Sequence, residues 1–248
     1  MASFYILFKK EFKGQLRTYR LLIVVAVFLV FGLGTPLLLK YLHELIPAEE
    51  ATILPEFTAI DAVKGYLDTL GQVGLITTIL VAMGMVSRER ETGTAAMTLS
   101  KPIGCGYFIT AKLAALALTF GLGIAVGAVG CYFYTVVLFE DPGGLNFLLA
   151  SLIGGLYLLF CLAVTLMYSS FFKSQLAAGG LALVTLVALV GSAGLPVMKD
   201  YSPGALPAWS QSVASGSSEN PWGVLIVSVV LIILTTIMGW QALKKKEL

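Results

Sequence analysis

The sequence is poor in charge. Asp, Glu, Lys and Arg make up only 12% of its 248 residues, about half the share in a soluble domain, whereas hydrophobic residues make up 58%. A soluble fold of this size cannot cover that much apolar surface with so few charges. The composition argues against a soluble enzyme, a nucleic-acid-binding protein and a disordered regulator. It predicts that lipid surrounds most of the chain.

The sequence also lacks the side chains of familiar catalytic and metal sites. His43 is its only histidine, which excludes an HExxH zinc site and a Ser–His dyad. The spacing of Cys105, Cys131 and Cys161 fits no zinc pattern. There is no GxxxxGK(S/T) phosphate loop either. We therefore expect no catalytic residue, metal site or cofactor in this chain.

The apolar residues gather in long continuous runs. About 20 such residues cross the 30 Å of hydrocarbon in a bilayer. Six runs reach or approach this length: about 21–39, 68–86, 113–138, 145–172, 176–195 and 222–243. The first is too long for a signal peptide and is followed by no clear cleavage site, which favours a retained span. Because the runs are continuous rather than alternating, they predict an all-α, polytopic membrane protein with six transmembrane helices.

The basic residues predict the orientation of the spans. With six spans, both ends of the chain lie on one side of the membrane together with loops 87–112 and 173–175. That side holds 13 of the 16 basic residues and only 4 of the 14 acidic ones. The basic residues are Lys9, Lys10, Lys13, Arg17, Arg20, Arg88, Arg90, Lys101, Lys112, Lys173, Lys244, Lys245 and Lys246. Since basic loops stay inside, both termini are predicted in the cytoplasm and the protein in the cell membrane.

The segment 3–20 reads as an amphipathic helix that precedes the first span. Its rings recur at every fourth residue and its charges fall on other faces, a pattern typical of a helix in the membrane interface. The residues that carry this pattern are Phe4, Phe8, Phe12, Lys9, Lys10 and Glu11. The alternative is an ordinary positive flank that only sets the topology.

Glycine and proline mark two further features. Gly123 and Gly127 form a GxxxG pattern in the third run, which indicates close helix packing. The outer loop 196–221 is rich in Pro, Ser and Gly. It is either an inert connector or a short re-entrant lid over a pathway.

Loop 87–112 has the densest charge pattern of the predicted cytoplasmic segments. Arg88, Glu89, Arg90 and Glu91 alternate in sign. Thr92-Gly93-Thr94 then breaks the run and can cap a short helix, which Lys101-Pro102 ends because the residue before proline disfavours helix. A charged and apolar stub at this position suits the docking of a soluble protein. The alternative is a solvated loop.

These residues resemble the permease subunits of type-2 ABC exporters. The resemblance rests on the loop "RERETGT…LSKPIGCGYFITAKL" and on the N-terminal "FKKEFKGQLRTYRLLI". The positions that match in the loop are Glu89, Glu91, Gly93, Thr94, Leu99, Ser100, Pro102, Tyr107 and Lys112. The chain is most similar to compact six-span members, such as those of nitrous-oxide-reductase maturation and sodium or drug efflux.

The resemblance implies a role and partners. Loop 87–112 would hold a coupling helix that sits in a cleft of an ATP-binding subunit, with the contact made by Arg88 to Thr94, Lys101 and Pro102. Two permease chains, identical or paralogous, and two ATP-binding chains would form the transporter. ATP and Mg²⁺ would be bound by the partner chains. The residues themselves leave two alternatives open, an ion-coupled secondary carrier and a non-transporting membrane scaffold.

For a transporter we expect a pathway between the first, second and fifth spans of two copies. Its polar lining is sparse, which favours a hydrophobic or amphiphilic cargo. The candidates for lining or bending the pathway are Thr35, Pro36, Thr77, Thr78 and Ser192.

Overall fold

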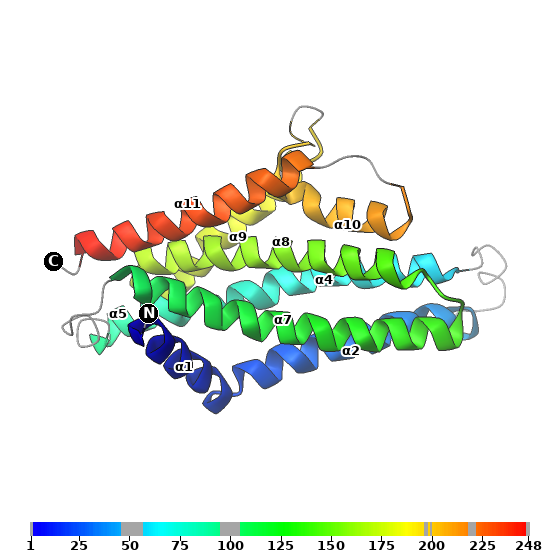
Figure 1. Ribbon diagram of the computed structural model, residues 1–248, viewed down its shortest axis with the longest axis horizontal. Coiled ribbons are helices and arrows are strands. Elements are labelled where there is room, and N and C mark those ends of the chain that lie inside the picture. Colours follow the sequence, from blue (N-terminus) through cyan, green and yellow to red (C-terminus); the bar gives the residue numbers. More distant parts are fainter. Residues whose placement is uncertain are drawn as a thin grey trace.

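The structure is a computed structural model that describes residues 2–45, 57–94, 105–195, 198, 200–217 and 222–246. All regular elements within these ranges are helices, which lie side by side along one long axis (Figure 1). The elements are α1 (Ala2–Arg17), α2 (Arg20–Leu45), α4 (Ala59–Ala82), α5 (Gly84–Glu91), α7 (Cys105–Leu138), α8 (Gly144–Phe171), α9 (Gln175–Ser192), η1 (Pro203–Ala205), α10 (Leu206–Ala214) and α11 (Trp222–Lys246). The all-α prediction is confirmed.

Six helices are long and apolar enough to cross a membrane, as predicted. Two of them begin earlier than the hydropathy indicates. The second span is part of a helical stretch over Ala59–Glu91. It starts at a capping box in which the Thr58 hydroxyl accepts from the Asp61 N–H and the Asp61 carboxylate accepts from the Thr58 N–H. The third, expected at 113, begins at Cys105, so Lys112 lies inside α7 and not in a loop.

The ends of the helices fall at two ends of the bundle. Both termini, α5 and the turn from α8 to α9 lie at one end, and the start of α4 and the turn from α7 to α8 lie at the other (Figure 1). This arrangement agrees with an even number of spans. We call the first of these the terminal end and the second the far end.

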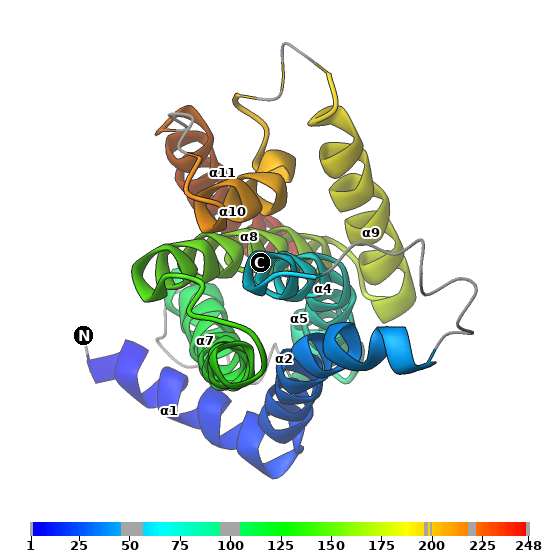
Figure 2. The same cartoon turned by 90° about the vertical axis from the view of Figure 1, so that its right-hand side faces the viewer.

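Seen end-on, α4 and α8 lie in the middle of the bundle, with α2, α7, α9 and α11 around them (Figure 2). The core is built from large apolar side chains of the inner helices, among them Leu67, Leu70, Phe120 and Leu158. Many apolar residues on the outer helices are exposed, for example Val184 at 66% and Ile226 at 61%. An outward-facing apolar surface is what a bilayer requires of a polytopic protein.

The glycine pattern of the third run brings α7 against α2. A Cβ atom on Gly127 would lie 2.7 Å from the carbonyl oxygen of Phe28, and one on Gly32 would lie 2.3 Å from the carbonyl oxygen of Gly127. Only glycine permits so close an approach of two helix backbones. The predicted close packing at Gly123 and Gly127 is confirmed.

The described part of the outer loop folds back onto the bundle. After α9 ends, η1 and α10 run along the part of α8 near the far end (Figure 1). Leu206, Ser210 and Ala214 of α10 are buried. Gln211 donates a hydrogen bond of 2.7 Å to the Asp68 carboxylate of α4. The segment is therefore a packed re-entrant element rather than a plain connector.

Candidate functional site

The charged residues expected to couple to a partner lie where α5 ends. Arg88, Glu89, Arg90 and Glu91 form the last turn of α5 at the terminal end of the bundle (Figure 1). The helix stops at Thr92, and Gly93 has a left-handed φ of 72°, the usual conformation after a helix C-terminus. Thr94 is described, whereas the rest of the expected short helix, with Lys101 and Pro102, lies outside the described residues.

A buried ion triad joins this turn to two other helices. The Nζ atom of Lys112 on α7 lies 3.0 Å from Glu11 Oε1 of α1 and 2.8 Å from Glu89 Oε1 of α5. Lys112 is only 1% exposed and Glu11 only 9%. The same ammonium lies 4.8 Å from the centre of the Phe108 ring. A lysine is buried this deeply only when its charge is paired.

The triad changes the interpretation of two residues. Glu89 was expected to face a partner, yet one of its oxygens is held inside the chain by Lys112. Lys112 was expected to sit in the loop at the start of the third span, yet it is a buried helix residue. Glu91, by contrast, is exposed at the end of α5. Of the two acidic residues in the resemblance, Glu91 is the one whose side chain is open to a partner.

The N-terminal helix rests on α7 through a polar face. Gln15 is 2% exposed, and its Oε1 accepts a hydrogen bond from the Thr119 hydroxyl. Leu7, Glu11 and Gln15 form the buried stripe. α1 runs across the bundle at an angle to the long helices (Figures 1 and 2).

The predicted ring pattern of α1 is present beside that buried stripe. The rings of Phe4 and Phe8 stack at 6.4 Å and those of Phe8 and Phe12 at 6.2 Å, all half-buried. Lys9 and Lys10 are exposed. The position of this helix in a membrane interface stays a prediction.

α5 is also clamped to α8. The Ser169 hydroxyl accepts from the N–H groups of Val86 and Ser87, at 3.1 and 3.0 Å, and donates to the carbonyl of Met83. Arg90 Nη1 donates to the Ser170 carbonyl at 2.6 Å. The last turn of α5 therefore contacts α7 and α8, is linked to α1 through Lys112, and is not a solvated stub on its own.

The candidate pathway residues fall in different surroundings. Thr35 lines a cavity of about 860 Å³ between α2 and α4, and its hydroxyl donates to the Phe31 carbonyl at 2.8 Å. Thr77 and Thr78, 8% and 0% exposed, are buried in the chain and do not face this cavity. Ser192 donates to the Leu189 carbonyl and contacts Ser202, so it fixes the turn into η1.

Pro36 is buried within α2. The final part of α2 turns away from the bundle axis (Figure 2). Because proline removes one helical hydrogen bond, it is the usual cause of such a bend. The structure therefore supports a bend in the first span.

A second cavity lies across α4 from the first. It measures about 1090 Å³ and is lined by α4, α9 and α10. Lys64 and Asp68 of α4 line both cavities. Asp68 lies 21 residues before Glu89, so a rise of 1.5 Å per residue separates them by about 31 Å, the thickness of the hydrocarbon. Lys64 and Asp68 lie in the first half of α4, which begins at the far end of the bundle (Figure 1).

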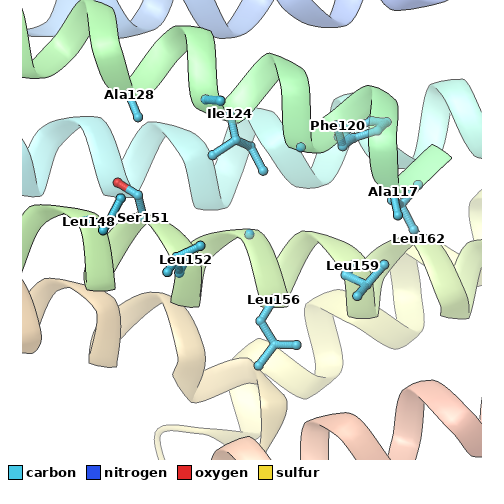
Figure 3. A pocket seen from close by; sticks show the side chains of 13 residues that line it. Ala117, Phe120, Ile124, Ala128, Leu148, Ser151, Leu152, Leu156, Leu159 and Leu162 are labelled. Atoms are coloured by element: carbon cyan, nitrogen blue, oxygen red, sulfur yellow. The ribbon is translucent and has the colours of Figure 1, made fainter. Parts of the chain in front are cut away.

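The side of the bundle between α7 and α8 has an apolar pocket of about 420 Å³. Ala128 of α7 lies opposite Ser151 of α8 at one end of it, and Phe120 of α7 lies near Leu162 of α8 at the other end (Figure 3). The Ser151 hydroxyl has no hydrogen-bond partner among the described residues. The pocket is otherwise lined by aliphatic and small side chains.

These features define a polytopic helical membrane protein with a cluster of charged contacts where α1, α5 and α7 meet. The described residues hold no cluster of His, Cys, Asp and Glu suited to a metal. The family model of the ABC-2 family transporter proteins matches residues 5–248, so the chain belongs to that family. It is also similar to an uncharacterized transmembrane protein, YxlG of Bacillus subtilis (strain 168), with 26% identity over 196 residues that cover 75% of each chain.

Family membership confirms the resemblance found in the sequence. The chain is a multi-pass membrane protein and a permease, or transport subunit, of an ABC transporter. Membership also implies association with ABC ATP-binding subunits. It favours a permease over the ion-coupled carrier and the scaffold.

Proposed function

We propose that this chain forms one half of the membrane part of an ATP-driven exporter. Two copies, or one copy and a paralogue, enclose the pathway in the cell membrane with their termini in the cytoplasm. Two separate subunits bind ATP and Mg²⁺. Loop 87–112 docks on these subunits and passes their movement to the helices.

The observation that carries this proposal is the Glu11–Lys112–Glu89 triad. Two strong charge-assisted contacts tie the end of α5 to Lys112 of α7 and, through Lys112, to Glu11 of α1. Arg90 and Ser169 tie the same turn to α8. A displacement of the loop is therefore transmitted to several spans together, as coupling to a soluble motor requires.

The cavities on both sides of α4 support a pathway on this face. They lie between α2, α4 and α9, which are the first, second and fifth spans. Their linings are mainly apolar, and the polar residues in them include Lys64, Asp68 and Gln211. An apolar pathway with a charged outer rim suits an amphiphilic cargo.

Charge reversal at the end of α5 tests the docking. The chain is co-purified with the ATP-binding subunit encoded beside it, and ATP turnover is measured for Glu91→Lys. We expect co-purification and turnover to fall about tenfold, because an exposed contact charge is reversed without disturbing the triad. Glu140→Lys, an exposed residue at the far end, is the matched control and leaves both unchanged. Wild-type behaviour of Glu91→Lys would show that the loop does not dock.

A further inference from the structure

A small polar pocket lies beside the ion triad, where α1, α2, α5 and α7 meet. Its volume is about 280 Å³. Its charged lining residues are Arg20, Arg88, Lys112, Glu11 and Glu89. The pocket therefore carries one net positive charge. The triad within it has one lysine between two carboxylates and is negative, so the positive charge belongs to the two arginines.

Those arginines have few partners of their own. Arg20 is half-buried, repelled by Arg88 and attracted by the two glutamates, and its Nη1 is in contact with the thioether sulfur of Met85. The side chain of Arg88 makes no hydrogen bond or ion pair with any other described residue. A pair of guanidinium groups in one pocket is a common arrangement for binding a phosphate.

Two further polar atoms at this pocket lack partners among the described residues. The Nε2 atom of Gln15 is a buried donor with no acceptor, on a side chain that is 2% exposed. The Oε2 atom of Glu89 is a buried acceptor with no donor. A buried polar atom without a partner is destabilising, so a ligand that supplies both an acceptor and a donor would stabilise the pocket.

The pocket lies at the depth of lipid headgroups. Arg20 is the first residue of α2 and of the first candidate span, and Arg88 belongs to the last turn of the second. Exposed apolar side chains follow directly in α2, with Leu22 at 60% and Ile23 at 50%. Acyl chains attached to a headgroup in the pocket would therefore meet an apolar surface.

We propose that this pocket binds the headgroup of a membrane lipid that combines a phosphate with a primary amine, as in phosphatidylethanolamine. The phosphate accepts hydrogen bonds from Arg20, Arg88 and Gln15 Nε2. The ammonium donates to Glu89 Oε2. The bound lipid fills the junction of α1, α5 and α7 and holds the triad in place. This proposal is independent of export and of ATP coupling.

A lipid suits the pocket better than an acidic segment of a protein partner. The pocket is small, and four helices of the chain surround it. It also lacks an exposed apolar anchor of the kind that protein interfaces use. A lipid reaches it from the membrane with its headgroup already at the right depth.

Native mass spectrometry of the full chain in detergent tests the proposal. Wild type is mixed with equal amounts of dioleoyl phosphatidylethanolamine, dioleoyl phosphatidylcholine, which has no N–H donor, and dioleoylglycerol, which has no phosphate. We expect one phosphatidylethanolamine to stay bound, with an occupancy about tenfold above either other lipid. Soluble phosphoethanolamine at the same concentration does not displace it. Equal binding of the three lipids, or displacement by the soluble headgroup, would overturn the proposal.

Variants locate the binding. Arg20→Gln with Arg88→Gln is expected to lower the occupancy about tenfold. The matched control is Lys13→Gln with Arg17→Gln, which removes two exposed charges of α1 outside the pocket and keeps the occupancy. Gln15→Glu retains the acceptor for Thr119 and replaces the free donor by a carboxylate, so it also lowers binding without loss of the α1 contact.

Thermal unfolding in detergent separates lost binding from lost folding, since Arg88→Gln changes an exposed side chain and should unfold like wild type. Unchanged lipid binding by the double arginine variant would overturn the proposal. So would an equal loss in the control pair, which would indicate general attraction to charge. Unchanged lipid binding together with loss of the ATP-binding subunit would assign the pocket to a protein partner instead.

Discussion

Lys112 shows how one charged residue organises three helices. It lies in an otherwise apolar segment of α7, and its neighbours across the junction are the carboxylates of Glu11 and Glu89. Removing one partner from a buried ion pair leaves the others buried and unpaired, which costs far more than the net contribution of the intact pair. The triad therefore depends most on Lys112, because without it both carboxylates lose their cation, whereas loss of one glutamate leaves Lys112 paired with the other.

Replacement of Lys112 by methionine should destabilise the protein strongly. Lys112→Met leaves the buried Glu11 carboxylate and the half-buried Glu89 carboxylate without their shared cation, and we expect a loss of about 3–5 kcal/mol. The measurement is the midpoint of thermal unfolding in detergent. Lys13→Met, which changes an exposed lysine of α1, serves as the control and should shift the midpoint little.

A rescue variant distinguishes charge from packing. Adding Glu11→Gln and Glu89→Gln to Lys112→Met removes the unpaired charges and should recover most of the lost stability. If the triple variant is as unstable as Lys112→Met alone, the cost comes from the shape of the side chain and not from its charge.

The sequence contained a signal for this residue that hydropathy averaging misses. Proline favours the first turn of a helix, and the residues between Pro102 and Lys112 that disfavour a helix are Gly104 and Gly106 alone. A helix that starts near Pro102 would therefore include Lys112. A lysine within such a helix near the membrane calls for a carboxylate partner. The predicted cytoplasmic side offers four, and no pattern in one sequence tells which two lie across from it. That choice depends on how α1 and α5 pack on α7.

At the scale of elements, the sequence predicted where the helices lie, but it predicted less well which side of each helix faces the bundle. Each of the six apolar runs corresponds to a helix, because the thickness of the hydrocarbon layer sets the length of a run that crosses it. The rings of α1 were also evident from their four-residue spacing. The same four-residue spacing predicted an apolar face for α1. However, Glu11 and Gln15 of α1 face the bundle, because Lys112 and Thr119 of α7 form hydrogen bonds with them. The pattern in one sequence indicates the faces of each helix, but it does not indicate which neighbouring helix packs on each face.

The contact of α2 with α7 gives a prediction with an internal control. In Gly127→Ala the new methyl group would meet the Phe28 carbonyl oxygen at 2.7 Å, so the helices must separate. We expect a loss of about 1–3 kcal/mol, seen as a lower unfolding midpoint. Gly121→Ala is on the same helix with no atom within 4 Å of the new group, and it should be neutral or gain up to about 1 kcal/mol. Equal midpoints for the two variants would contradict the close packing.

At the scale of the whole molecule, the distribution of charge predicted which helix ends lie together, but it did not predict that α10 packs back onto the bundle. The start of α1, the end of α11, α5 and the start of α7 share one end of the bundle, as the count of spans required (Figure 1). For loop 196–221, the sequence left two alternatives, an inert connector and a short re-entrant lid. The structure shows α10 there, with Pro207 in its first turn and a buried side, Leu206, Ser210 and Ala214, that recurs every four residues. The cavity beside α10 was not visible in the sequence because it requires α4, α9 and α10 together.

The orientation in the membrane can be tested at two exposed serines. Ser174 lies in the turn between α8 and α9, and Ser217 follows α10. With Cys105 replaced by serine and Cys131 and Cys161 buried, a membrane-impermeant maleimide should label Ser217→Cys in intact cells. It should label Ser174→Cys only after permeabilisation, since the basic side is predicted to be the cytoplasm. The opposite pattern would invert the topology.

The unequal lengths of the spans have a consequence for the bilayer. α9 has 18 residues and rises about 27 Å, whereas α7 has 34 and rises about 51 Å. α9 ends well before the far end reached by α8 (Figure 1). Lipid beside α9 must thin to match it, and such hydrophobic mismatch costs a fraction of a kcal/mol per ångström. The activity of the protein should thus depend on membrane thickness. We expect ATP turnover of the reconstituted transporter to fall as the acyl chains of the lipid lengthen. Equal rates in thin and thick bilayers would show that the short length of α9 does not affect activity.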